Sequence, residues 1–415
     1  MDKWVHFRHY FHPAGHGTFF SAHINRSVSS EGFVWIYDCG SNRATHIRDL
    51  VSQFCRRPQA RGSIDVVCVS HFDRDHVEGL EELLQAATVK VLVLPYLSLQ
   101  ARIYLAGQAE LEDEDSSHNV AAMILNPVRY LESRDLGERV ARIIVVRGGD
   151  SEDVGPGPKL DPNEPGDLNN ECVEINVLTR PLETDEAWHQ DSSRIEVAQH
   201  SAPWLLGGLY ELMFYNCALQ GDVTAKSGAS LAEVAAELAV IQKDYEIFSG
   251  RPKDGWISAL RNLYDMHFGR EKRNDVSLVV LGRPLVRGEF RMCRAFARSF
   301  PHVSESLSLP ESPLRPAILL NGDYSFTSPR LAKVREHFGI DRWGSIGVMQ
   351  VPHHGSQHSW TPGLSAECVH AHSVVCAPPN ARHPHGTVAH DLRHRNPVIA
   401  SYSKALAFDY HVSRP

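Results

Sequence analysis

The hydrophobic positions of this chain fall into short β-branched runs separated by stretches with helical spacing. Runs such as residues 66–69 and 89–94 are rich in Val and Leu and predict buried strands. Between these two runs Leu80, Leu83 and Leu84 recur three and four positions apart, which predicts a helix. The same alternation returns after residue 274. Strands that alternate with helices predict an α/β fold in layers.

Polar side chains with metal-binding chemistry follow several of the predicted strands. They are His71, Asp73, Asp75 and His76 after the first strand, Asp323 after the strand that begins at Ala317, and His353 and His354 after the strand that begins at Ile346. Burial of so many polar groups is costly unless a divalent cation offsets the desolvation. A solvated turn is the simpler alternative for each motif alone. Together they favour two divalent cations that share a carboxylate.

Other candidate residues have two interpretations. Asp38, in an Asp-Cys-Gly sequence, either belongs to a plain turn or orients a histidine ligand from behind. His383, which follows the strand predicted near residue 374, fits a surface turn or a proton donor. Arg74 and Arg382 could clamp a substrate phosphate, or they could be ordinary surface arginines.

The composition of the chain limits the type of protein and the binding partners to be expected. The chain has 415 residues, 42% of them hydrophobic and 22% charged, as in globular proteins. A net charge of −8 gives no general attraction to nucleic acid, so a polyanion would need a local basic patch or a metal centre. The eight cysteines lack Cys-x-x-Cys spacing, which predicts free thiols in a reducing cytoplasm. The absence of a signal-peptide or long apolar segment predicts that the chain has no membrane contact.

The order of the motifs resembles the metallo-β-lactamase fold and, within it, the ComEC-type competence nuclease domains. The motifs are Ser70-His71-x-Asp73-x-Asp75-His76-x-x-Gly79, Gly322-Asp323, Val351-Pro352-His353-His354-Gly355-Ser356, Gly15-His16-Gly17, Asp38-Cys39-Gly40, Asn274-x-x-Ser277 and Asn380 to Pro384. The resemblance covers residues 5–97 and 272–410. It implies an αβ/βα sandwich with a two-metal site at one edge.

The resemblance also implies roles for individual residues. The implied metal ligands are His71 and Asp73 for one ion, Asp75 and His76 for the other, Asp323 as a bridge, and His353, with His354 as its alternative. Asp73 stands where the commonest form of the fold has a second His, and a further His that is usual in the fold has no counterpart. A more oxygen-rich site favours Mn²⁺, although Zn²⁺ binds more tightly in general. The predicted cofactors are therefore two divalent ions, Zn²⁺ or Mn²⁺.

Between residues 98 and 271 the pattern changes to acidic and Gly/Pro-rich stretches, a few strands and a long helix. That helix begins at Ser230 and Glu233, which have the spacing of a capping box. The segment carries no cluster of metal ligands. We therefore expect a metallo-β-lactamase-like domain at 1–97 and 272–415, and a mostly helical inserted subdomain at 98–271 that lies beside the site.

These features predict a metal-dependent phosphodiesterase, with a nuclease as the leading interpretation. A hydroxide activated by two metals would attack phosphorus in line. Asp75, His354 and His383 are the predicted catalytic residues, and either histidine could protonate the leaving oxygen. The predicted partners are a nucleic acid or nucleotide substrate and a protein bound through the insertion. The alternatives are a hydrolase of a lactone, thioester or signalling nucleotide, and a binding or assembly module with a regulatory metal site.

Overall fold

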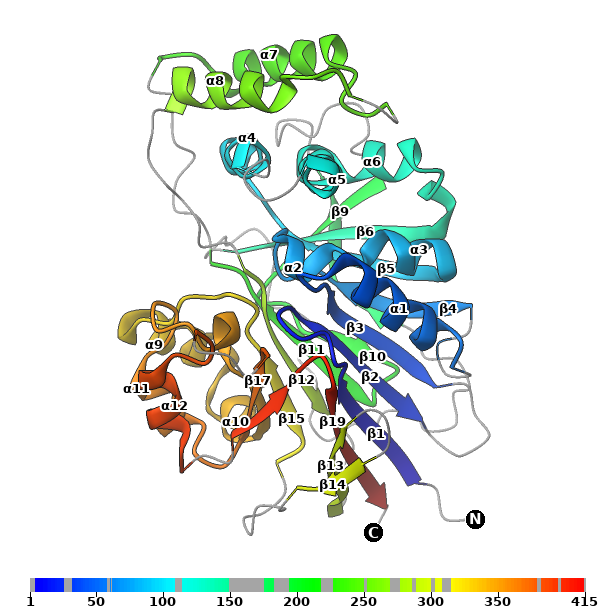
Figure 1. Ribbon diagram of the computed structural model, residues 1–415, viewed down its shortest axis with the longest axis vertical. Coiled ribbons are helices and arrows are strands. Elements are labelled where there is room, and N and C mark those ends of the chain that lie inside the picture. Colours follow the sequence, from blue (N-terminus) through cyan, green and yellow to red (C-terminus); the bar gives the residue numbers. More distant parts are fainter. Residues whose placement is uncertain are drawn as a thin grey trace.

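Two β-sheets that pack face to face form the centre of the protein in the computed structural model (Figure 1). Both sheets mix parallel and antiparallel strands, and helices lie beside them, so the fold is mixed α/β as the sequence predicts. The described residues are 4–25, 32–57, 60, 62–108, 114–148, 175–182, 194–217, 227–249, 252–268, 277–285, 289–299, 303–307, 315–378, 382–394 and 397–413.

The larger sheet has eleven strands within the described residues. In spatial order they are β14 (Val303–Ser306), β13 (Glu289–Ser299), β19 (Lys404–Ser413), β1 (Trp4–Phe11), β2 (Phe19–Asn25), β3 (Phe33–Cys39), β4 (Ser63–Cys68), β5 (Thr88–Pro95), β6 (Val140–Arg147), β9 (Ile195–Gln199) and β8 (Thr179–Pro181). Neighbours from β3 through β9 are parallel, with Tyr37 opposite Cys68 between β3 and β4. Their carboxyl ends therefore meet at one edge of the sheet.

The smaller sheet has eight strands within the same residues. In spatial order they are β18 (Pro397–Ala400), β17 (His372–Cys376), β16 (Ile346–Gln350), β15 (Ala317–Leu320), β12 (Val279–Pro284), β11 (Tyr210–Tyr215), β10 (Trp204–Leu206) and β7 (Ile175–Asn176). The four strands from β15 to β18 are parallel. This sheet therefore also has an edge where the ends of several parallel strands gather.

Large side chains from both sheets fill the space between them. Phe7 on β1 and Trp35 on β3 lie with their ring centres 5.9 and 6.3 Å from that of Tyr210 on β11. All three residues are fully buried. Because apolar area removed from water stabilises by about 25 cal/mol per Å², such contacts hold the two sheets together.

Helices cover the outer face of each sheet (Figure 1). Against the larger sheet or beyond its helices lie α1 (Ala44–Cys55), α2 (Arg74–Val77), α3 (Leu80–Ala86), α4 (Leu99–Gln108), α5 (Glu114–Leu125), α6 (Pro127–Ser133), the 3₁₀ turn η3 (Gly137–Arg139), α7 (Leu231–Asp244) and α8 (Trp256–Phe268). On the side of the smaller sheet lie α9 (Ser328–Phe338), α10 (Ile340–Gly344), the 3₁₀ turn η6 (Pro352–Gly355), α11 (Pro362–Glu367) and α12 (Gly386–Leu392).

The sequence signals account for several of these helices. In α1 apolar residues recur at helical spacing and form its buried face; they are Ile47, Leu50, Val51 and Phe54. The capping box predicted at the start of α7 is confirmed, because Ser230 Oγ accepts from Glu233 N at 3.2 Å while the Glu233 carboxylate accepts from Ser230 N at 2.7 Å. These bonds satisfy backbone donors that would otherwise be left unpaired at the helix start.

The segment 98–271 is joined to both sheets rather than being helical throughout. Its strands β6, β8 and β9 belong to the larger sheet, and β7, β10 and β11 belong to the smaller one. Its helices α4 to α8 share the hydrophobic cluster on the outer side of the larger sheet, and α7 and α8 lie farthest from the sheets (Figure 1). The sheet order marks no domain boundary at residue 97 or residue 272, so that division stays a prediction.

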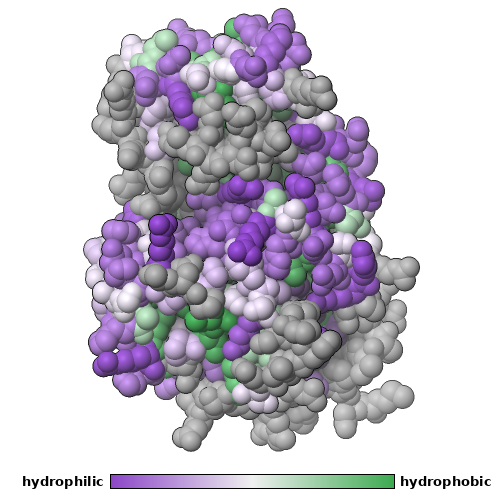
Figure 2. Space-filling model, viewed as in Figure 1, coloured by the Kyte–Doolittle hydropathy of each residue, from purple (hydrophilic) through white to green (hydrophobic). Residues whose placement is uncertain are grey.

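The surface shows no broad apolar area on the face in Figure 2. Outside the grey atoms, hydrophilic residues predominate and apolar residues form small separate patches (Figure 2). Among the described residues no helix is both long enough and apolar enough to span a bilayer. The cysteines whose side chains are described are free, as the sequence predicts; they are Cys39, Cys55, Cys68, Cys217, Cys368 and Cys376.

Candidate metal centre

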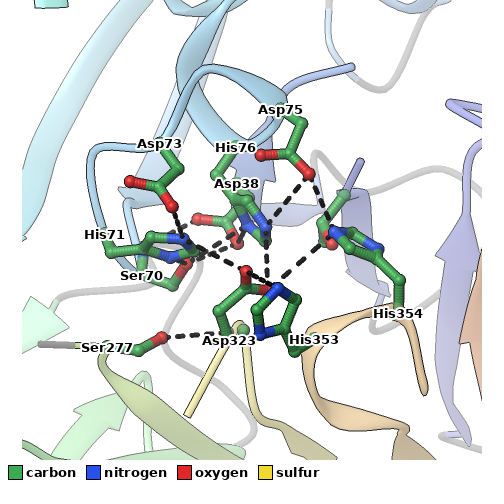
Figure 3. Close-up of polar contacts among 12 residues, drawn as sticks. Asp38, Ser70, His71, Asp73, Asp75, His76, Ser277, Asp323, His353 and His354 are labelled. Carbon is green, nitrogen blue, oxygen red and sulfur yellow. Dashed lines mark hydrogen bonds and ion pairs between the residues drawn. The ribbon is translucent and has the colours of Figure 1, made fainter. Parts of the chain in front are cut away.

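The predicted ligands converge because they follow parallel strands of the two facing sheets. The end of β3 carries Asp38, and the loops after β4, β15 and β16 carry the segment 70–76, Asp323 and the pair His353 and His354; all of these meet at one place (Figure 3). Ligand sites in α/β proteins commonly lie at the carboxyl ends of parallel strands. The structure thus brings together side chains that are far apart in the sequence.

A first group of donors consists of His71, His76 and Asp323. Nε2 of His76 lies 3.2 Å from Asp323 Oδ1, and Nε2 of His71 lies 3.7 Å from Asp323 Oδ2. Within the described part of the chain, Nε2 of both histidines and Asp323 Oδ1 are buried and, apart from these ion-pair contacts with one another, have no hydrogen-bond partner. Buried polar atoms are nearly always paired. A cation between these three atoms would satisfy them all, so the residues fit a metal site.

A second group lies beside the first and consists of His16, Asp75 and His354. Asp75 Oδ2 is 2.8 Å from His354 Nε2 and 3.8 Å from His16 Nε2. The same oxygen is 3.8 Å from His76 Nε2, which connects the two groups. His16 was not predicted as a ligand. Its only signal in the sequence is its position between Gly15 and Gly17, which both adopt positive φ and turn the chain toward Asp75.

Asp73 and His353 lie at the outer side of the first group. Asp73 Oδ2 is 3.4 Å from His71 Nε2, but the Asp73 side chain is 68% exposed. Nε2 of His353 is 3.4 Å from Asp323 Oδ2, and its side chain is 45% exposed. Both residues can reach an ion in the first group, although neither is buried in it.

The grouping differs from the one that the resemblance implies. His76 lies with His71 and Asp323, whereas Asp75 lies with His16 and His354. All of the predicted ligands lie in or beside the two groups, and Asp323 contacts donors of both, with Oδ1 3.9 Å from His354 Nε2. Which residue binds which ion stays a prediction. His354 is better placed for the second group than His353, whose Nε2 faces the first.

Hydrogen bonds behind the ligands determine which ring nitrogen faces the centre. Asp38 Oδ2 lies 2.7 Å from His76 Nδ1, and it also accepts from Ser70 Oγ at 2.7 Å. The Ser70 oxygen can then accept the Nδ1 proton of His71, 2.8 Å away. The Cys376 carbonyl, 2.7 Å from His354 Nδ1, has the same effect. All three rings therefore present Nε2 to the centre and use Nδ1 for a supporting hydrogen bond, the usual arrangement of metal-binding histidines.

The structure supports the second interpretation of Asp38, that it orients a histidine. Asp38 is fully buried and has a φ of 55°, a left-handed conformation that Asp tolerates better than most residues. It also accepts from Ser70 N at 2.6 Å, which fixes the loop that carries His71. Gly322, at a φ of 49°, turns the chain so that Asp323 N donates to Ser277 Oγ at 3.2 Å. The ligands are thus held by contacts outside the ligand set.

Changing Asp38 to Asn is expected to weaken binding of the cation in the first group by about 10–100-fold. The carboxylate accepts from Ser70 N through Oδ1, while Oδ2 serves Ser70 Oγ and Nδ1 of His76. An amide has an NH₂ donor in place of one of these oxygens, so it cannot accept at both positions. Asn tolerates the same positive φ, so the backbone should not change. Titration of the metal-loaded variant with a chelator measures the affinity. An unchanged first site with a normal second site would contradict the role of Asp38.

For His76 and Asp323, the charges of neighbouring residues shift the pKa in the direction opposite to the effect of burial. Burial alone would lower the pKa of His76, but the carboxylates of Asp75, Asp323 and Asp38 raise it well above its ordinary value. Burial would raise the pKa of Asp323, but His76 and His71 hold it well below the usual range. In the absence of a cation, protons on the imidazoles therefore balance the carboxylates.

Binding of Zn²⁺ or Mn²⁺ is therefore expected to release protons, and the affinity should rise with pH. The pKa values of His71, His76 and His354 are raised, which favours the protonated rings, and a metal must displace a proton from Nε2 of each protonated ring. Calorimetric titrations in buffers with different ionisation enthalpies measure the number of protons released. A heat of binding that is the same in every buffer would contradict this expectation.

The remaining predicted residues lie around the centre. His383 has its ring centre 5.3 Å from that of His16 and 6.5 Å from that of His354, at the border of the second group. Arg382 is exposed next to it. Nε of Arg74 is 3.3 Å from Glu78 Oε2, one turn further along the chain, so its charge is partly neutralised. The roles of these residues stay predictions.

No protein-family model matches the chain, and no curated protein is similar to it. Asn274 and Asn380, which belong to two of the motifs behind the family resemblance, lie outside the described residues. The functional assignment therefore depends on the arrangement of the side chains. That arrangement offers two adjacent groups of three nitrogen and oxygen donors.

Proposed function

We propose that the protein is a metal-dependent phosphodiesterase, with nucleic acid or a nucleotide as its substrate. The observation that carries this proposal is the pair of adjacent donor groups, each with two imidazoles and one carboxylate. Two divalent cations close together are a common solution for phosphodiester cleavage, because they stabilise both the attacking and the leaving oxygen. Two facing sheets with outer helices and a site at one edge are also consistent with an αβ/βα metallo-β-lactamase sandwich.

In this proposal His71, His76 and Asp323 hold one cation, and His16, Asp75 and His354 hold the other. A bound divalent cation acts as a Lewis acid and makes water a nucleophile near neutral pH. The prediction that Mn²⁺ is the better cofactor depended on Asp73. With His16 in the second group, the donor set suits Zn²⁺ as well, so both ions remain in the proposal.

Residues of the chain orient the histidine ligands and can donate a proton to the leaving oxygen. Asp38 and the Cys376 carbonyl keep His76 and His354 in one tautomer, so their rings need not reorient during turnover. His383 is the proposed donor to the leaving oxygen. Burial, followed by the neighbouring His354 and His353, lowers the pKa of His383, so the free ring is neutral at pH 7. An anionic substrate beside the ring would raise that pKa and so favour the protonated form that donates to the leaving oxygen.

Hydrolysis assays with metal-loaded protein test the proposal. Bis(p-nitrophenyl) phosphate, single- and double-stranded DNA, RNA and cyclic dinucleotides are the phosphodiester substrates, and a lactone and a thioester are the comparison substrates. We expect cleavage of at least one phosphodiester, and its loss on chelation. Cleavage of the lactone or thioester alone would instead support a small-molecule hydrolase. Tight metal binding without hydrolysis would support a binding module.

A further inference from the structure

An exposed arginine lies next to the loop that carries His16. Arg43 immediately precedes α1, and the residue before it, Asn42, donates its backbone N–H to the carbonyl of His16 at 2.9 Å. The guanidinium carbon of Arg43 lies 4.0 Å from the ring centre of Tyr402, on the turn between β18 and β19. Three segments that are distant in the sequence thus meet beside the second donor group.

The Tyr402 ring is fixed by contacts on several sides. Its hydroxyl donates to the side-chain oxygen of Asn42, and its ring centre lies 5.2 Å from that of His46, edge to face. It also packs on Gly15 so closely that a Cβ at that position would overlap the ring. The Tyr402 ring is therefore a rigid support that packs on Gly15, the residue before His16.

Arg48 and Arg74 share a carboxylate that partly neutralises them, whereas Arg43 does not pair with one within the described part of the chain. Glu78 receives both Arg74 and Arg48, at 3.3 and 3.7 Å. Among the residues that the structure describes, Arg43 forms no ion pair with a carboxylate, and its side-chain contact is with the Tyr402 ring. A cation–π contact of this kind does not use the five N–H donors of the guanidinium as hydrogen-bond donors to a carboxylate, so they can bind an anion.

We propose that Arg43, held on Tyr402, binds a phosphate group of the substrate. The planar fork of a guanidinium matches two oxygens of one phosphate. Because the ring already restricts the side chain, less conformational freedom is lost when the anion binds. This inference rests on the proposed function. It assigns to Arg43 the role that the sequence suggested for Arg74, whose charge Glu78 partly neutralises.

The test compares Arg43→Gln, Arg43→Lys, Tyr402→Ala and the control Arg48→Gln in metal-loaded protein. Calorimetry measures the affinity for inorganic phosphate, and hydrolysis of bis(p-nitrophenyl) phosphate gives kcat and KM. Loss of a charged hydrogen-bonding partner should weaken phosphate binding by roughly 10–100-fold in Arg43→Gln. KM should rise similarly, with a smaller change in kcat and unchanged metal content. Arg43→Lys should restore only part of the affinity, and Tyr402→Ala should give an intermediate loss.

The control and the two readouts separate the possible outcomes. Arg48 lies in the first half of α1, close to Arg43 along the chain, and is exposed. Because it already pairs with Glu78, the Arg48→Gln variant should behave like the unmodified protein. Phosphate affinity and KM that are unchanged in Arg43→Gln would overturn the inference, as would an equal loss in Arg48→Gln. If the unmodified protein cleaves no phosphodiester, but Arg43→Gln still weakens phosphate binding, the proposed function fails and the anion site stands.

Discussion

Replacing Asp323 by Asn is expected to lower phosphodiester hydrolysis by on the order of a thousandfold while the fold is retained. The two oxygens of Asp323 lie 3.2 to 3.9 Å from Nε2 of His71, His76, His353 and His354. Asp75 also contacts donors of both groups, but through Oδ2 alone, whereas Asp323 uses both of its oxygens. The amide keeps the shape of the side chain but removes its negative charge. The repulsion between two adjacent cations would then no longer be offset by a carboxylate at this position.

Steady-state kinetics and elemental analysis of the purified variant test this expectation. Asp341, an exposed residue on α10, provides the matched control, because Asp341→Asn also removes one negative charge but lies on the surface. Circular dichroism and thermal unfolding establish that both variants are folded. Normal turnover and full metal content in Asp323→Asn would rule out Asp323 as the shared carboxylate.

Replacing His16 by Ala is expected to reduce the metal content from two ions per chain to one. His16 supplies one of three donors in the second group, and Asp75 and His354 alone would bind a cation weakly. Because removal of even an outer supporting residue costs about 10–100-fold in affinity, loss of a ligand should cost at least as much. The first group, which contains no atom of His16, should keep its ion.

The stoichiometry is measured by elemental analysis after dialysis against a fixed free concentration of Mn²⁺ or Zn²⁺. His358 is a suitable control, because it is exposed and belongs to neither group. His358→Ala should keep two ions per chain. Two ions in His16→Ala would show that the second site does not depend on this residue.

The position of the site was predictable because it depends on local patterns. The runs before His71 and Asp323 are β-branched and aliphatic, and the carboxyl ends of parallel strands in two facing sheets meet at one edge. Each polar cluster that follows such a strand was therefore expected near the others. The structure confirms that they lie together, and it places Asp38 behind His76.

The division of ligands between the two groups was not predictable in the same way. The spacing of residues 71, 73 and 75 is that of an extended segment, in which every second side chain points the same way, but Arg74 to Val77 form the helical turn α2. In a helix, consecutive residues are about 100° apart, so Asp75 and His76 point to different groups. His16 reaches the site only because the loop before β2 packs against Asp75, a contact between residues that are distant in the sequence.

The pairing of Arg74 with Glu78 and the strands of segment 98–271 are two further differences from the prediction. Arg74 and Glu78 are four positions apart, the spacing of a helical ion pair, so the neutralisation of Arg74 could have been expected. Except for β6, the strands of segment 98–271 have six residues or fewer, and their places toward the far ends of the two sheets depend on pairing with distant strands. No local pattern specifies such pairing.

The central claim is that the two donor groups hold two divalent cations side by side. Anomalous diffraction from crystals of the Mn²⁺-loaded protein tests it most directly, because the signal comes from the metal alone. The account predicts two peaks, one bonded to Nε2 of His71 and His76 and to Asp323, the other bonded to His16, Asp75 and His354. The absence of a peak from one group or from both, in crystals of the fully loaded protein, would contradict it.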